Sequence, residues 1–231
     1  VERMNEALEF LAERLGTTLE AAEEMRERLK KSRSLAHELD EITWREGRIS
    51  GWENHLWLVS TSDFNGDYLE YQRQLEELIK GSRNRKPYPD GMLRIAYIGV
   101  PSVFARDLYH SLEQNGARVV LNEIQRQFAM PDPGHSLAEQ YSNYTYPYSI
   151  FDRLEDIKLE LRRRRVSGVI HYVQSFCHRG IGDIIIRHSL DLPILTLEGN
   201  DEYLLNQHLR TRVEAFIDMI KRRERLSALL T

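Results

Sequence analysis

Apolar residues recur three or four positions apart over much of the N-terminal part of the chain. This spacing predicts a short helix over residues 4–15, a long second helix over 18–39 and a further helix over 68–80. Gly16 is well placed to end the first of them. The apolar run 56–59 is short, and periodicity does not decide between a strand and the end of a helix.

From residue 93 onwards the pattern changes to short apolar runs that alternate with amphipathic segments. A strand over 93–98, a helix over 103–115 with Ser102 as its N-cap, and a strand over 117–121 fit a right-handed parallel βαβ unit. The alternation then continues through the following expected elements: helix 150–165, strand 167–173, helix 182–190, strand 194–197 and helix 207–230. Between them, residues 128–148 read as a long irregular loop or lid.

This order of elements predicts the fold class. Alternating strands and helices form a doubly wound α/β protein, here with a parallel sheet of about four strands and helices on both faces. The N-terminal helices are additional to that unit. We therefore expect an N-terminal helical segment over residues 1–50 and an α/β domain over 51–231.

Composition narrows the class of protein further. The 231 residues are 41% hydrophobic and 29% charged, which excludes a disordered chain. A net charge of −4 and the lack of a long apolar run argue against nucleic acid and membrane as partners. One cysteine and no recognisable leader make the cytoplasm the expected location. The chain begins with Val1 rather than Met, which suggests a processed chain or a piece of a longer protein.

The loops that follow the strands are the places to look for chemistry, because ligands of open parallel sheets bind beyond the carboxyl ends of the strands. The richest of these loops contains Cys177, the only cysteine, just before a predicted helix. Helix N–H groups and the adjacent Arg179 would favour a thiolate there, which is a nucleophile or a metal ligand. A buried inert cysteine is an equally weighted alternative. A Cys–His pair with His178 or His171 is also possible.

Other features of the sequence do not by themselves define a functional site. Neither C-x-x-C nor H-x-x-x-H occurs, so a metal at Cys177 needs ligands from elsewhere. Gly180 and Gly182 make an isolated G-x-G, which does not define a nucleotide site. Arginines 162–165 fall at a helix end, where cations offset the helix dipole. His171, within a strand, is interpreted as a core histidine. Four tyrosines could line a pocket or pack the loop: Tyr141, Tyr144, Tyr146 and Tyr148.

Three segments together resemble one known family. They are the strand and loop 167–177 (SGVIHYVQSFC), the strand 192–198 (LPILTLE) and the helix that begins QHLRTRVEAF at residue 207. In order and spacing they resemble the 2-hydroxyacyl-CoA dehydratase family, which includes benzoyl-CoA reductase subunits. The combination of the Phe-Cys loop with Thr-Arg-x-Glu-Ala-Phe is the most specific element, and the resemblance covers most of the chain.

The resemblance implies a flavodoxin-like fold and an oxygen-sensitive enzyme built from two homologous subunits. In the family, cysteines hold a 4Fe-4S cluster at a domain interface, and Cys177 matches one ligand. An ATP-dependent activator protein injects one electron, and a ketyl radical of an (R)-2-hydroxyacyl-CoA then eliminates water. The loop around the cysteine would bind the cofactor and tune its potential through its neighbours: Gln174, Ser175, His178 and Arg179.

Departures from the family pattern leave alternatives open. Further cysteines are lacking, and Lys30 stands where the resemblance leads us to expect an asparagine before Arg33. The chain alone is therefore expected to be inactive, as the C-terminal part of a subunit. The alternatives are a benzoyl-CoA reductase-type subunit, a non-catalytic scaffold without the cluster, and a cysteine-nucleophile enzyme. Arg212 and Glu214 match the family motif, with an ion pair that holds the terminal helix to the sheet as their expected role.

Overall fold

The computed structural model describes residues 1–102, 104–145, 149–199 and 204–230. Its N-terminal part is helical, as the periodicity predicts. The helices are α1 (Glu2–Arg14), α2 (Leu19–Glu41), α3 (Gly51–Val59) and α4 (Tyr68–Ser82). The run 56–59, which the sequence left open, is the end of helix α3.

A short break separates α2 from α3. A π-helical turn (Ile42–Glu46) follows α2 and ends at Gly47, whose φ of 63° is left-handed. Helix α3 then begins with a capping box. The Ser50 hydroxyl accepts a hydrogen bond from the Glu53 backbone N–H at 3.1 Å, and Glu53 Oε2 accepts one from the Ser50 N–H at 3.0 Å. These bonds fix the direction in which α3 leaves the turn.

The second part of the chain forms a four-stranded sheet in which every pair of neighbours is parallel. The strands are β1 (Leu93–Gly99), β2 (Ala117–Asn122), β3 (Gly168–Gln174) and β4 (Ile194–Gly199). Their order in the sheet is β2-β1-β3-β4. The predicted parallel sheet of about four strands is confirmed.

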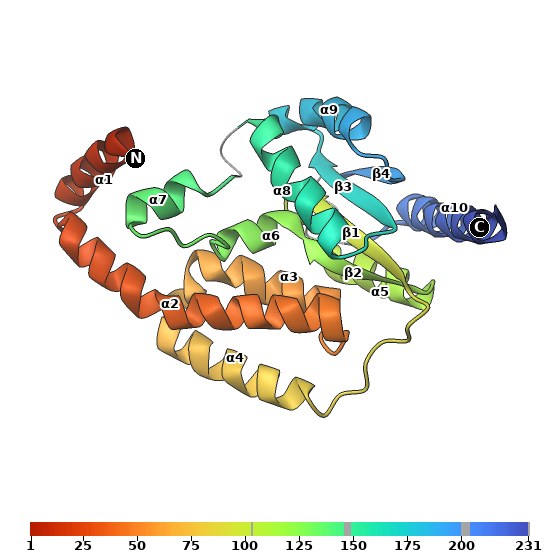
Figure 1. Ribbon diagram of the computed structural model, residues 1–231, viewed down its shortest axis with the longest axis horizontal. Coiled ribbons are helices and arrows are strands. Elements are labelled where there is room, and N and C mark those ends of the chain that lie inside the picture. Colours follow the sequence, from red (N-terminus) through yellow and green to blue (C-terminus); the bar gives the residue numbers. More distant parts are fainter. Residues whose placement is uncertain (103, 146–148, 200–203, 231) are drawn as a thin grey trace.

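Helices cover both faces of this sheet (Figure 1). Helices α5 (Ala105–Gln114) and α10 (Gln207–Leu230) enclose one apolar core with the strands. Helices α8 (Ile150–Arg163) and α9 (Gly182–Ser189) enclose a second core on the opposite face. The doubly wound architecture is therefore as predicted.

Helices α2, α3 and α4 form a third layer with its own apolar core, beside the β2 edge of the sheet. The start of α3 packs so closely on β2 that it requires a glycine, because a Cβ on Gly51 would lie 2.8 Å from Cβ of Val119. Helices on both sides of residue 50 share the core of this layer, and a domain division at that residue stays a prediction.

A chain of buried polar groups joins this layer to the sheet domain. Asp40 of α2 pairs with Arg164 at the end of α8, with an Nη2–Oδ2 distance of 2.6 Å. Asn54 Nδ2 donates to Asp40 Oδ1 at 3.0 Å, and its Oδ1 accepts a bond of 2.7 Å from Asn122 of β2. Arg164 also pairs with Glu160 at 2.7 Å. Because the members are buried and bonded to each other, the network fixes how the two layers pack.

His55 lies at the other end of this network, with Nδ1 3.0 Å from the Tyr109 hydroxyl and 3.1 Å from Nε2 of Gln125. Burial lowers the pKa of His55 from 6.5 to about 4. The unfolded chain therefore binds a proton that the folded chain does not bind between these pH values. Protonation of His55 should therefore lower the free energy of unfolding by up to about 1.4 kcal/mol per pH unit as the pH drops from 6.5 to about 4.

Urea unfolding at several pH values between 7 and about 4.5 tests this expectation. The pH dependence of the free energy of unfolding should be shallower in His55→Gln than in the unchanged chain. Equal slopes would contradict a neutral, buried His55.

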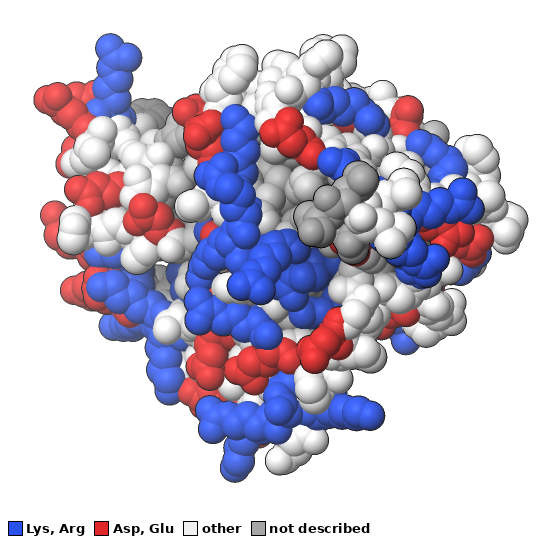
Figure 2. All heavy atoms as spheres, turned by 45° about the vertical axis from the view of Figure 1, so that its right-hand side comes forward, with Lys and Arg blue, Asp and Glu red and all other residues white. Residues whose placement is uncertain are grey.

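The basic run at the end of α8 serves the packing of the layers. Figure 2 shows a dense group of Lys and Arg side chains on one face of the molecule, bordered by Asp and Glu. Arg163 pairs with Glu41, while Arg164 is fully buried against Asp40 and Glu160. Guanidinium groups of both arginines lie over the Trp44 ring, at 5.1 and 5.6 Å from its centroid. The run does end a helix, as predicted, but its second role in joining layers was not foreseen.

Two local predictions need correction. Helix α5 begins at Ala105 with Phe104 as N-cap, so Ser102 does not cap it. The expected irregular segment 128–148 contains a helix, α7 (Leu137–Ser142), which follows α6 (Glu123–Phe128). Ser136 caps α7 by accepting a bond of 3.2 Å from the Glu139 N–H. Across the described part of the chain, each helix is too short or too polar to cross a membrane.

Candidate functional site

The strand order places a switch point between β1 and β3. From β1 the chain proceeds to β2 on one side, and from β2 it returns to β3 on the other side of β1. The connections therefore leave the carboxyl ends of β1 and β3 in opposite directions, which opens a crevice where ligands of doubly wound sheets bind.

Gly99 ends β1 at this crevice and brings two backbones close together. Its φ is +94°, and a Cβ at this position would lie 2.1 Å from the Tyr172 carbonyl oxygen of β3. Only glycine fits both the conformation and the contact. The loop after β3 consequently lies directly beside the end of β1.

Cys177 lies in that loop and lines a hollow at the switch point together with Gly99, Val100 and Gln174. The Cys177 N–H donates to the Gln174 carbonyl oxygen at 2.9 Å, and the Gly180 N–H donates to the Cys177 carbonyl oxygen at 2.9 Å. These bonds hold the loop in a tight turn. The hollow measures about 20 Å³, room for one water molecule, and the cysteine is partly exposed.

Arg153 lines this hollow and forms a buried ion pair. Nε and Nη2 of Arg153, from α8, donate to the two carboxylate oxygens of Glu123, from α6, at 3.0 and 2.9 Å. Glu123 also accepts a bond of 3.3 Å from the Gly99 N–H. The pair thus holds the end of β1 in place, and no motif in the sequence indicates it.

His171 is a core histidine, as predicted. Its side chain is buried, and its Nδ1 lies 2.6 Å from Oδ1 of Asp183 in α9. Asp183 also accepts bonds from Thr196 and Arg187, both at 2.7 Å. Burial lowers the pKa of His171, although the Asp183 carboxylate opposes this effect. His171 therefore fastens α9 to the sheet, as a neutral ring near neutral pH.

Large apolar side chains are exposed around the Cys177 loop. Phe176 is 77% exposed and Ile181 73%. Phe151 at the start of α8 and Ile184 of α9 are also exposed, and all four residues belong to segments at the carboxyl end of the sheet. Exposed apolar residues gathered at one end of a domain are typical of a surface that another protein surface covers.

The other predicted loop residues divide into two groups. Gln174 lines the hollow with Cys177, whereas Ser175 and His178 are exposed and do not line it. The side chain of Arg179 lies outside the described part of the structure. Of the four tyrosines, Tyr146 and Tyr148 also lie outside it. The roles of these loop residues toward a cofactor stay predictions.

Cys177 could supply one ligand to a metal centre and no more. Among the described residues there is no group of three or more His, Cys, Asp or Glu side chains that could hold a metal ion. An iron–sulfur cluster needs three or four protein ligands. A metal centre at Cys177 would therefore need ligands from outside the described residues.

The terminal helix is fastened to the sheet differently from what the sequence analysis expected. Arg212 of α10 donates from Nη2 to the Thr196 carbonyl oxygen of β4 at 2.8 Å. Among the described residues, neither Arg212 nor Glu214 forms the expected ion pair. Arg212 does hold the helix to the sheet, through a backbone carbonyl.

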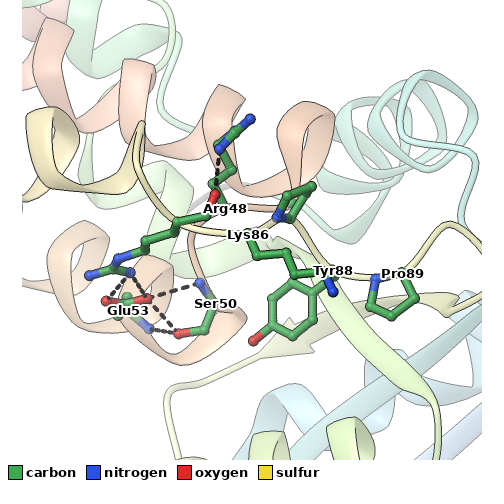
Figure 3. A pocket seen from close by; sticks show the side chains of 9 residues that line it. Arg48, Ser50, Glu53, Lys86, Tyr88 and Pro89 are labelled. Atoms are coloured by element: carbon green, nitrogen blue, oxygen red, sulfur yellow. Dashed lines mark hydrogen bonds and ion pairs between the residues drawn. The ribbon is translucent and has the colours of Figure 1, made fainter.

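A larger hollow lies at the start of α3, with a volume of about 380 Å³ (Figure 3). Figure 3 shows Glu53 facing Ser50, in the capping box described above. Arg85 pairs with Glu53 at 2.7 Å, and Arg48 donates to the Arg83 carbonyl oxygen at 3.0 Å. Ser50, Glu53, Arg48 and Arg85 already have partners within the protein, so the volume alone does not mark this hollow as a ligand site.

The fold and the Cys177 loop define an α/β protein with its candidate site at the switch point of an open parallel sheet. A model of the family described as 2-hydroxyglutaryl-CoA dehydratase, D-component, matches residues 1–220. The chain therefore belongs to this family, and the resemblance noted in the sequence is confirmed. No curated protein sequence matches the chain.

Proposed function

We propose that the chain is part of a 2-hydroxyacyl-CoA dehydratase-type enzyme and that Cys177 supplies one ligand to its 4Fe-4S cluster. Membership in the dehydratase family over residues 1–220 carries the first part of the proposal. The second part rests on the position of Cys177, because the only cysteine of the chain lines the switch-point hollow and is partly exposed.

The chain's own residues would hold this ligand in place. The turn from Gln174 to Gly180 fixes the Cys177 backbone, and the pair of Glu123 with Arg153 fixes the facing end of β1. When bound, a cluster would lend one electron to a CoA-thioester carbonyl and recover it after the 2-hydroxyl group and a hydrogen from the neighbouring carbon have left as water, so that the dehydration is redox-neutral overall. Exposed Phe176 and Ile181 would exclude water once a partner surface covers them.

The partners follow from the same proposal. A homologous second subunit or domain would bring the remaining ligands, since the described residues supply no complete set. An ATP-dependent activator protein would deliver the electron, and an acyl-CoA would be the substrate. Ring reduction, as in benzoyl-CoA reductase, is the alternative reaction. Because Cys177 is the one cluster ligand proposed for this chain, a second candidate function is a scaffold subunit that keeps the fold without the cluster.

Activity of the assembled enzyme tests the reaction. The complete subunit, purified without oxygen with its partner subunit and an activator, should convert (R)-2-hydroxyglutaryl-CoA to the unsaturated acyl-CoA in the presence of ATP. Cys177→Ala should abolish product formation. An equally active Cys177→Ala enzyme would contradict the role of Cys177. If the unchanged enzyme does not dehydrate (R)-2-hydroxyglutaryl-CoA but reduces an aromatic acyl-CoA, the reaction is ring reduction instead.

A further inference from the structure

A cavity of about 320 Å³ lies where α2 faces α7 and the segment after α6. Four side chains from α2 line it, because positions three and four apart share one face of a helix: Lys30, Arg33, Ser34 and His37. Met130 and Gln140 contribute to the opposite wall. This space, called here the Arg33 cavity, shares no lining residue with the hollow at Cys177.

Arg33 is the residue that gives the cavity its chemistry. Its Nη1 donates to the Phe128 carbonyl oxygen at 2.9 Å, and its guanidinium lies 5.2 Å from the centroid of the Phe64 ring. Within the described residues it has no carboxylate partner. A guanidinium has five N–H donors, so several remain for a ligand.

Arg33 differs in this respect from the other arginines in the interior. Arg153 and Arg164 each pair with a carboxylate. Arg94 and Arg118 have no carboxylate partner in the described structure, but each donates to two backbone carbonyl oxygens. Arg33 has one carbonyl oxygen and one aromatic ring as partners, so its charge is compensated less completely than the charges of the arginines that pair with carboxylates. An anion in the cavity would provide this compensation.

The remaining walls suit an anion as well. Lys30 adds a second positive charge, and Gln140 adds an amide from α7, while none of the lining residues is acidic. Lys30 is itself paired with Glu27 at 2.5 Å on the helix surface, so Arg33 is the principal charge. Met130 has a φ of 52°, a strained conformation for a residue with a side chain. Strained backbone of this kind concentrates at ligand-binding sites.

We propose that the Arg33 cavity binds a small organic anion whose carboxylate or phosphate group pairs with Arg33. The planar guanidinium matches two oxygens of either group. The volume lies at the small end of the range for small-molecule sites, which favours a compact metabolite over a large cofactor. The site does not depend on a cluster at Cys177, and its function as a substrate or regulatory site would follow from the ligand found.

Calorimetric titration of the complete polypeptide with succinate and, separately, with inorganic phosphate tests the proposal. At least one of these probes should bind saturably with one site per chain. Arg33→Gln should weaken this binding about ten-fold or more, because a charge-assisted hydrogen-bonded pair is lost. Arg28→Gln is the matched control, since it removes an exposed arginine from the same helix outside the cavity and should change the affinity less than about two-fold.

A second variant separates binding from folding, because Arg33 also holds Phe128 and Phe64. Ser34 is exposed at the cavity, so Ser34→Glu should fold normally and place a competing carboxylate beside Arg33. It should abolish binding, whereas the uncharged Ser34→Gln should retain it. The proposal is overturned if neither probe binds, or if Arg33→Gln and Ser34→Glu bind as tightly as the unchanged chain.

Discussion

Replacing Asp40 by alanine is expected to lower the free energy of unfolding by about 3–5 kcal/mol. Asp40 is the partner of Arg164, a fully buried guanidinium, and it also accepts a hydrogen bond from Asn54. The substitution leaves the Arg164 charge with Glu160 as its only carboxylate in the described structure and breaks the network that joins α2 to the sheet domain. Urea unfolding followed by circular dichroism measures the change.

Glu76→Ala provides the control for this experiment. Glu76 pairs with Lys31 at 2.6 Å across the same helical layer, but both side chains are exposed, so the loss should stay below about 1 kcal/mol. A loss for Asp40→Ala no larger than for Glu76→Ala would show that the buried pair does not join the layers.

The same carboxylate should make stability depend on pH in the acid range. Burial acts to raise the pKa of Asp40, but the Arg164 charge outweighs it and holds the pKa below 3.8. A carboxyl with a lowered pKa in the folded state stabilises the protein above its ordinary pKa. This contribution is therefore present above about pH 4 and is lost as the pH falls further.

Most of the fold could be predicted because periodicity reports burial directly. Strand β3 reads as an apolar run since both of its faces are covered, and α10 shows one apolar face. The start of α5 could not be placed in this way. Ser102 has the right side chain for an N-cap, yet the first turn begins at Ala105, because the backbone before a helix depends on how the chain leaves the preceding strand.

The candidate site was only partly visible in the sequence. Cys177 could be located because parallel strands direct their following loops to one edge of the sheet. The pairing of Arg164 with Asp40 could not be predicted, since the two residues are 124 positions apart. A run of arginines at a helix end is also explained by the helix dipole. The Arg33 cavity was hidden for a similar reason. The spacing of its α2 residues is visible in the sequence. The opposite wall at Met130 and Gln140 depends on tertiary packing and is not.

The second large effect expected is the loss of iron from a Cys177 variant. One cluster ligand from this chain implies that the complete polypeptide, purified without oxygen with its partner, contains about four irons per cluster and equal acid-labile sulfide. Cys177→Ser should lose most of the iron, because a serine oxygen is a poorer ligand for iron in a cluster. His178→Ala should retain it, since His178 is exposed and does not line the hollow.

The most direct test of the account is the iron and sulfide content of the complete polypeptide with Cys177 intact and with Cys177→Ala, both checked for folding by circular dichroism. We expect about four irons with the cysteine and few or none in the folded variant. Full iron content in Cys177→Ala, or no iron in either protein, would contradict a cluster ligand at the end of β3.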